Sequence, residues 1–161
     1  MTKLLILSDS HGRSGKVKKM IAANKDADGI IYLGDGEKDL EAALAENEIH
    51  WYGEEPETFV YQVRGNCDRQ SNEAVTIISE IDGVRFYITH GFEQGVKYGL
   101  EKLANFAREK DCAVALFGHT HGAHLSELNG IRLFNPGCAA NGGYGIILID
   151  KGKVKFRHES I

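Results

Sequence analysis

Residues 3–12 read KLLILSDSHG, an apolar run that stops abruptly at a carboxylate and an imidazole. Its four central residues, Leu4 to Leu7, predict a strand buried on both faces, as found in a sheet that is covered by helices. The following segment, Ser14–Asn24, has apolar residues at helical spacing, and Gly29–Leu33 is a second apolar run of strand length. This β-α-β order predicts two parallel strands with a helix packed outside them.

The alternation continues along the rest of the chain. Two further helices are predicted at Glu37–Glu46 and Val96–Glu109, and further strands at Phe59–Val63, Val75–Ile81, Arg85–Thr89, Ala113–Phe117, Ala123–Leu128, Ile131–Phe134, Gly145–Ile149 and Val154–His158. The segment between residues 49 and 58 fits no period and is predicted to be a connecting loop, and Asn129-Gly130 is typical of a tight hairpin. Units of strand and helix at the front and hairpins at the back predict an α/β fold with two sheets packed face to face and helices outside.

Composition favours one globular domain over residues 1–161. The chain carries a formal net charge of −4, which argues against a partner that is a long nucleic acid, because such binding relies on clustered Lys and Arg. No stretch reaches the ~18 apolar residues of a membrane span, and the N-terminal apolar run is too short for a secretory signal. Cys67, Cys112 and Cys138 are odd in number and lack CxxC spacing, so we expect reduced thiols and a cytoplasmic protein.

Predicted strands end, one after another, in a glycine and a residue of a type that binds metals. These residues are Asp9, His11, Asp35, Asn66, His90, His119 and His121. Since the carboxyl ends of parallel strands meet at one edge of a sheet, we expect five loops to deliver them to one crevice. Taken singly, Gly34-Asp35 or Gly65-Asn66 is typical of an ordinary turn, so the prediction depends on the ordered set.

The donor types indicate the kind of ion. Carboxylate, imidazole and amide oxygen suit Mn²⁺, Fe²⁺, Zn²⁺ or Ni²⁺ better than a closed structural zinc site. Seven donors exceed what one tetrahedral ion can use, whereas two ions that share a bridging carboxylate would use them all. Two carboxylates against two dications leave the centre positive, which attracts a phosphoryl group despite the negative net charge of the chain.

In this order, Asp9-x-His11, Gly34-Asp35, Gly65-Asn66-x-Asp68, His90 and Gly118-His119-x-His121 resemble the calcineurin-like metallophosphoesterase superfamily over about residues 3–150. Asn135-Pro136-Gly137 is similar to a segment of its small bacterial branch, the YfcE-type phosphodiesterases. The resemblance implies a four-layer αββα sandwich of two mixed sheets. It also implies a dinuclear centre, with Mn²⁺ as the expected metal, in which Asp9, His11 and His121 hold one ion, Asn66, His90 and His119 hold the other, and Asp35 bridges them.

One position departs from the wider superfamily. Many relatives have a histidine after the ligand asparagine, where it is credited with a catalytic role, but this chain has Cys67. A thiol is a weak hydrogen-bond donor, so we expect weak assistance to poor leaving groups and better rates with activated aryl esters. We attach no catalytic role to Tyr32. Arg13 and Asp68 are candidate substrate contacts, Arg13 through a phosphate oxygen. We also expect Asp68 either to orient a ligand histidine or to cap its loop.

The hypothesis drawn from these residues is a metal-dependent phosphodiesterase acting on a small phosphoester, with in-line attack by a hydroxide that bridges the ions. Its catalytic residues would be Asp35, Asn66, Cys67 and His90. The alternatives are a phosphomonoesterase or a nucleotide pyrophosphohydrolase on the same centre, and a largely non-catalytic binding or scaffold module of the same fold. Strand edges near the C-terminus offer a way for subunits to pair into a homo-oligomer.

Overall fold

The computed structural model describes residues 1–161 and contains ten strands and three α-helices. The strands are β1 (Thr2–Leu7), β2 (Gly29–Tyr32), β3 (Phe59–Gln62), β4 (Thr76–Ile81), β5 (Val84–Thr89), β6 (Val114–Leu116), β7 (His124–Leu128), β8 (Ile131–Asn135), β9 (Gly143–Asp150) and β10 (Lys153–Ser160). The helices are α1 (Ser14–Ala22), α2 (Glu37–Glu46) and α3 (Glu101–Glu109), with short 3-10 turns η1 (Val96–Tyr98) and η2 (Ala139–Asn141).

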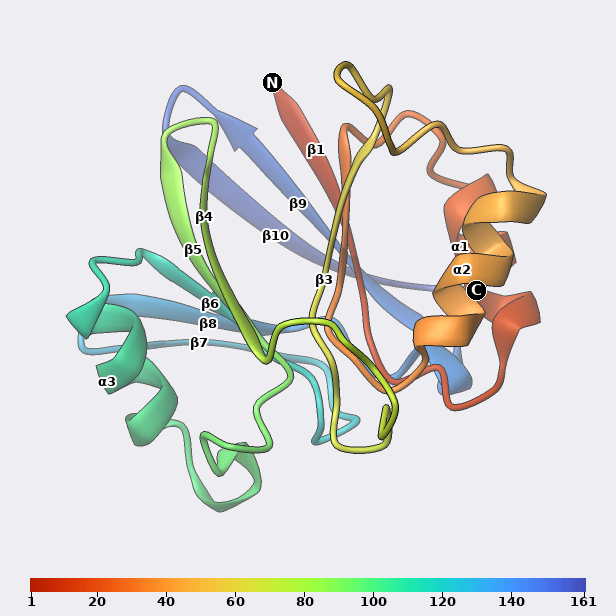
Figure 1. Cartoon of the computed structure of the whole chain (residues 1–161). Helices are drawn as coiled ribbons and strands as arrows, with labels where there is room; N and C mark the ends of the chain where they lie inside the picture. Colours follow the sequence, from red (N-terminus) through yellow and green to blue (C-terminus); the bar gives the residue numbers. More distant parts are fainter.

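These elements form two mixed five-stranded sheets (Figure 1). The first has the strand order β10-β9-β1-β2-β3 and the second β4-β5-β6-β8-β7. Helices α1 and α2 cover the outer face of the first sheet, and α3 covers the outer face of the second. The predicted αββα sandwich is therefore confirmed.

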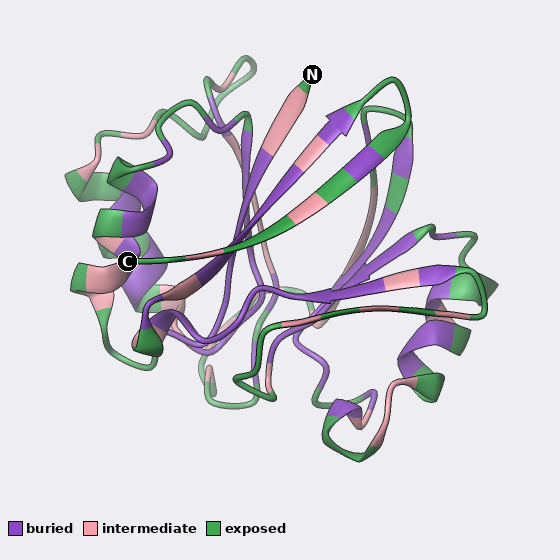
Figure 2. Cartoon of the chain, turned by 180° about the vertical axis from the view of Figure 1, so that it is seen from behind, coloured by how far each residue is buried: buried purple, intermediate pink, exposed green.

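The core lies in three apolar layers, one between the sheets and one under each set of helices. Alternate residues of β1 separate two of these layers, because Leu4 and Ile6 face the opposite sheet while Leu5 and Leu7 face α1 and α2. All four are completely buried, as the purple segments of Figure 2 illustrate. Burial on both faces explains why this strand is apolar throughout rather than alternating.

Parallel pairing decides where the functional loops emerge. β1, β2 and β3 run parallel in the first sheet, and β5, β6 and β8 run parallel in the second. The last residues of β1, β2 and β3 lie in register, with Leu7 beside Tyr32 and Tyr32 beside Gln62. The loops that follow these strands consequently meet at one end of the sandwich.

The predicted helix Val96–Glu109 is wrong as one element. The chain forms the 3-10 turn η1, breaks at Gly99 and resumes as α3 at Glu101. Gly99 has a φ of 130°, which an L-residue rarely adopts, so a continuous helix cannot pass through it. The helical spacing of apolar residues was correct on both sides of the break and therefore concealed it.

The predicted hairpin at Asn129-Gly130 is confirmed, because β7 and β8 pair across these two residues. Asn129 and Gly130 both have positive φ, 53° and 80°, as a two-residue turn of the hairpin type requires. β9 and β10 are longer than predicted, because their antiparallel pairing extends to Gly143 opposite Ser160. Among the helices, none combines the length and the apolar character that crossing a membrane would require.

Candidate metal centre

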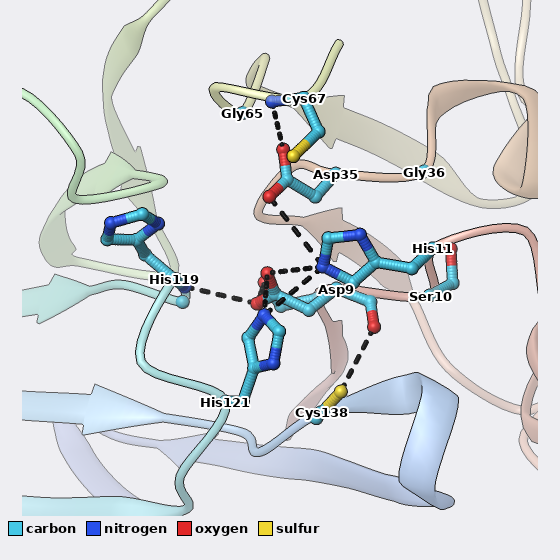
Figure 3. Close-up of polar contacts among 12 residues, drawn as sticks. Asp9, Ser10, His11, Asp35, Gly36, Gly65, Cys67, His119, His121 and Cys138 are labelled. Carbon is cyan, nitrogen blue, oxygen red and sulfur yellow. Dashed lines mark hydrogen bonds and ion pairs between the residues drawn. The ribbon is translucent and has the colours of Figure 1, made fainter.

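All seven predicted ligands lie in loops that follow the carboxyl ends of parallel strands, and their donor atoms converge. Figure 3 shows five of them, namely Asp9, His11, Asp35, His119 and His121. Asp9 and His11 follow β1, Asp35 follows β2, Asn66 follows β3, His90 follows β5, and His119 and His121 follow β6. Parallel pairing contributes to the convergence, since within each sheet the carboxyl ends of the parallel strands lie at the same edge.

The first donor group consists of Asp9, His11 and His121. Oδ1 of Asp9 lies 3.5 Å from Nε2 of His11 and 3.3 Å from Nε2 of His121. The two Nε2 atoms are only 3.1 Å apart, so one imidazole donates its N–H to the lone pair of the other. Three donors at these separations can surround a single ion.

The second donor group consists of Asp35, His90 and His119, with Asn66 beside them. Nε2 of His90 lies 3.2 Å from Oδ2 of Asp35 and 3.0 Å from Oδ1 of Asn66. Oδ2 of Asp35 is also 3.7 Å from Nε2 of His11, so this carboxylate lies between the two groups. That position is the one a bridging ligand would occupy.

The residues present fit a bound cation, and the clearest sign is an orphaned oxygen. Oδ1 of Asp9 is buried and has no hydrogen-bond partner. Oδ2 of the same carboxylate accepts bonds from the Ser8 hydroxyl at 2.5 Å and from the His119 backbone N–H at 3.1 Å. A buried carboxylate oxygen without a partner is costly, and a divalent ion between it and the neighbouring imidazoles would satisfy it.

Hydrogen bonding selects the nitrogen through which His90 would bind. Its Nδ1–H donates to the backbone carbonyl of Leu33 at 2.6 Å, which leaves Nε2 facing Asp35 and Asn66. A bond of this kind fixes the tautomer and the ring orientation of a ligand histidine. His90 is therefore oriented toward the centre by the backbone of the first sheet.

The titration of the central residues reflects their mutual contacts. Burial raises the pKa of Asp35, but the hydrogen bond and charge of His90 together with the Cys67 N–H outweigh it and hold this pKa at about 2. Burial lowers the pKa of His90, but its contact with Asp35 and the nearby charge of Asp9 raise it overall. Burial and the charge of His90 lower the pKa of His119, which keeps that imidazole neutral and able to bind an ion.

Five of the ligands adopt left-handed backbone conformations. Their φ values are 59° for Asp9, 44° for His11, 62° for Asp35, 66° for His119 and 64° for His121. For residues other than glycine this conformation costs about 1–2 kcal/mol each. Neighbouring loops hold it in place, since Asp9 N–H donates to the Gly34 carbonyl and His11 N–H to the Asp35 carbonyl.

Behind the ligands of the β1–α1 loop lies a buried hydrogen-bond network that the sequence did not predict. The Ser10 hydroxyl is 2.5 Å from the Tyr32 hydroxyl and 2.5 Å from Oδ2 of Asp39, which also accepts the Gly12 N–H at 2.8 Å. Burial raises the pKa of Tyr32, so its phenol stays protonated. Nothing in the sequence distinguishes Asp39 from the other acidic residues of its helix.

Asp68 caps the loops of the centre. Its carboxylate accepts the backbone N–H groups of Asp35 at 2.7 Å, Gly36 at 3.0 Å, Glu37 at 3.3 Å and Gly65 at 2.9 Å. Of the two predicted roles for Asp68, the structure has the loop cap, and it contains no hydrogen bond from this carboxylate to a ligand histidine. Both oxygens accept backbone N–H groups, and the contact of Asp68 with substrate stays a prediction.

Asn135 is a second residue whose role the sequence did not reveal. It is completely buried, and its amide donates to the Gly118 carbonyl at 3.1 Å and to the Thr120 hydroxyl at 3.0 Å. These bonds hold the loop that carries His119 and His121. Asn135 belongs to the Asn135-Pro136-Gly137 segment of the resemblance, and its role is to bind the loop after β6 through these two hydrogen bonds.

Two cavities open beside the donor groups. One, of about 420 Å³, is lined by Asn66, His90, Phe92, Arg64 and Arg69 among others. The other, of about 670 Å³, is lined by His11, Asp35, Cys67, Lys38 and Arg69 among others. Arg13 precedes α1 and lines neither cavity, whereas Arg69 lines both. Arg69 therefore joins Arg13 as a candidate for a phosphate contact.

Comparison with known protein families agrees with this geometry. The model of the calcineurin-like phosphoesterase superfamily domain matches residues 2–148. A protein of Mycoplasma pneumoniae described as a probable metallophosphoesterase is 28% identical over 140 residues, which covers 85% of this chain and 79% of that protein.

Solved structures share the fold. A conserved protein of Streptococcus pneumoniae described as a predicted phosphoesterase superposes with a TM-score of 0.80 at 23% identity, covering 99% of this chain and 89% of that one. A novel archaeal phosphodiesterase has a TM-score of 0.75 at 22% identity and covers 99% and 100%. Vps29 of Entamoeba histolytica, in complex with Zn²⁺, has a TM-score of 0.74 at 17% identity and covers 99% of both chains.

Proposed function

The chain belongs to the calcineurin-like phosphoesterase superfamily, and we propose that it is a metal-dependent phosphodiesterase with a dinuclear centre. The observation that carries the proposal is the convergence of two groups of donors around a shared carboxylate, with cavities on both sides. The name of the archaeal phosphodiesterase that shares the fold points in the same direction.

The chain's residues divide into holders of two ions and a bridge. Asp9, His11 and His121 would hold one ion, Asn66, His90 and His119 the other, and Asp35 would contact both. Bound divalent ions supply Lewis acidity toward phosphoryl oxygens and activate water as a nucleophile. We propose Mn²⁺ as the native metal, since carboxylate and amide oxygens suit it and imidazole is compatible with it.

Positioning of the bridge falls to the backbone. The Cys67 N–H donates to Oδ1 of Asp35 at 2.8 Å, and this leaves Oδ2 directed at His90 and His11. Asp68 holds the backbone N–H of Asp35 from the other side. The carboxylate is thereby fixed before any ion or substrate arrives, which is the preorganisation that catalysis by charge stabilisation requires.

A diester is favoured over a monoester because the two cavities flank the donor groups. A phosphodiester carries two substituents on phosphorus, and with the phosphoryl group at the centre each substituent can enter one cavity. The smaller cavity has an aromatic rim, because the Phe92 ring packs edge-on against the His119 ring at 5.5 Å and is 58% exposed. Arg69, which lines both cavities, can contact a phosphoryl oxygen.

The experiment compares hydrolysis of bis(p-nitrophenyl) phosphate with that of p-nitrophenyl phosphate by the full chain in Mn²⁺. We expect faster cleavage of the diester, and we expect chelation and the Asp35→Asn substitution each to abolish it, the latter together with metal loading. Faster cleavage of the monoester would instead support a phosphomonoesterase, and exclusive cleavage of dinucleoside polyphosphates a pyrophosphohydrolase.

The second candidate is a scaffold without catalysis, and the observation that raises it is the shared fold of Vps29. The full donor set of this chain argues against it, because function depends on the site and not on the fold. Protein that purifies without stoichiometric metal and hydrolyses no phosphoester with any divalent ion would favour the scaffold.

A further inference from the structure

One side chain at the centre offers a donor atom that the superfamily's ligand set does not include, the sulfur of Cys67. We propose that this sulfur is an additional ligand of an ion bound by His11 and Asp35, and that it raises the affinity of the centre for thiophilic ions such as Co²⁺, Zn²⁺ and Cd²⁺ while Mn²⁺ still binds through the oxygen and imidazole donors. The inference deepens the proposed function and rests on it only in requiring a bound metal.

The geometry that supports this ligand is a third donor cluster. Nε2 of His11, a carboxylate oxygen of Asp35 and Sγ of Cys67 all lie within 4.8 Å of one another. Neighbouring donors at bond lengths of about 2.0–2.3 Å from one ion stand less than about 4 Å apart, so a closure of about 1 Å brings the three atoms to coordinating separations. Figure 3 shows the Cys67 sulfur beside the Asp35 carboxylate, which lies between the sulfur and the His11 ring.

The loop that carries Cys67 is held so that the thiol faces the centre. Its own backbone N–H is bound to Asp35, and the Asn66 amide donates to its sulfur at 3.6 Å. The side chain is exposed and lines the larger cavity, so an ion and a displaced proton have access to it. Coordination therefore requires no opening of the fold.

The other two thiols cannot perform this task. Cys112 is buried, and its sulfur faces the Lys110 carbonyl. Cys138 is also buried, and its S–H donates to the backbone carbonyl of Asp9 at 3.2 Å, away from the donor atoms of the centre. Any sulfur-to-metal signal from this chain would thus originate from Cys67.

Coordination would remove the proton from the Cys67 thiol and change the charge of the centre. As the bond between sulfur and metal forms, the thiol proton passes to solvent, and the centre gains one negative ligand. Thiolates select soft and borderline ions, whereas Mn²⁺ and Mg²⁺ prefer oxygen. A coordinated sulfur carries no proton to donate to a leaving group, which favours esters whose leaving groups need no protonation.

The test is a titration of the metal-free full chain with Co²⁺ under reducing, anaerobic conditions. The visible d–d bands report on Co²⁺ bound by any donors, and a near-ultraviolet charge-transfer band reports on a sulfur ligand. We expect both in the wild-type chain, loss of only the charge-transfer band in Cys67→Ser, and retention of both in the Cys112→Ala control.

Calorimetry gives the second readout. Loss of an outer-shell partner already weakens metal binding by about 10- to 100-fold, so we expect Cys67→Ser to weaken Cd²⁺ binding by at least about tenfold. Mn²⁺ affinity should stay within about twofold, because this ion favours oxygen donors. Wild-type d–d bands without a charge-transfer band, or a charge-transfer band that survives Cys67→Ser, would overturn the sulfur ligand alone. Absence of both bands in the wild type would overturn the metal centre and the proposed function with it.

Discussion

Gly65 is the position where adding a single methyl group should disable the centre. A Cβ built on this residue would meet the carboxylate of Asp35, and it would lie 2.7 Å from the Asp35 backbone nitrogen. The φ of Gly65 is not in the left-handed region, so the effect of Gly65→Ala is steric and not conformational. Real Cβ atoms essentially never approach another heavy atom within 3.0 Å, so either the carboxylate or the loop must move.

Movement of the Asp35 carboxylate or of its loop would cost stability. Oδ1 of Asp35 accepts the Cys67 N–H at 2.8 Å, and breaking a hydrogen bond to a charged group costs about 1.5–3 kcal/mol. Overpacking of a tight site adds about 1–3 kcal/mol. We therefore expect Gly65→Ala to lower the free energy of unfolding by about 2.5–6 kcal/mol. Displacing the bridging carboxylate by about 1 Å should reduce hydrolysis about 100-fold.

The measurements are urea unfolding of the metal-free chain, Mn²⁺ affinity by calorimetry and the rate of bis(p-nitrophenyl) phosphate hydrolysis. Gly15→Ala is the matched control, because it is the same substitution inside α1, where a Cβ would meet nothing within 4 Å. It should raise the free energy of unfolding by about 0.5–1 kcal/mol and leave hydrolysis unchanged. Wild-type metal affinity and activity in Gly65→Ala would refute the reasoning.

Three further perturbations test the surroundings of the centre. Tyr32→Phe removes the hydroxyl that accepts the Ser10 N–H at 3.2 Å in a buried site, and it should lower the free energy of unfolding by about 1–3 kcal/mol; an unchanged urea midpoint would contradict this. Asp68→Asn replaces one of two accepting oxygens by a donor, so backbone N–H groups of the loops lose their partner. We expect the free energy of unfolding to fall by about 1–3 kcal/mol and Mn²⁺ to bind more weakly by calorimetry. Wild-type values of both quantities would exclude the role of Asp68 as a loop cap. For the metal-free chain, the lowering of the Asp35 pKa from 3.8 to about 2 contributes about 2 kcal/mol of stability, which is present above pH ~4 and lost as the pH falls through ~2. Acid unfolding of Asp35→Asn should lack this component. Identical profiles of stability against pH for the wild type and Asp35→Asn would disprove it.

The architecture and the ligand set were predictable because they depend on local patterns. Apolar runs of four or five residues bounded by turn residues, such as Leu4 to Leu7, favour strands buried on both faces, and in this fold each functional strand ends in a glycine and a metal-type residue. The parallel order of strands then brings the loop residues together. The sequence alone therefore sufficed to name all seven donors that converge in the structure.

The supporting contacts were not predictable, because they join residues distant in the chain. Asp68 caps the β2–α2 loop across more than thirty residues, and Asp39 reaches back from α2 to Ser10. Arg13 was expected near substrate from its closeness to His11 in sequence, yet it directly precedes α1 and is not among the residues that line the two cavities, whereas Arg69 lines both. Closeness in sequence therefore does not predict closeness in space for residues that follow a change of chain direction.

The left-handed conformations of the ligand residues bear on how such a centre is inherited and lost. Replacing His121, whose φ is 64° and whose side chain is 46% exposed, by glycine removes a donor while relieving backbone strain of about 1–2 kcal/mol. Substitution of His121 by glycine would therefore favour folding stability and weaken metal binding. Selection for catalysis must therefore oppose such stabilising substitutions continuously. Where that selection relaxes, the fold can persist after the metal ligands are lost and can then serve only as a binding surface.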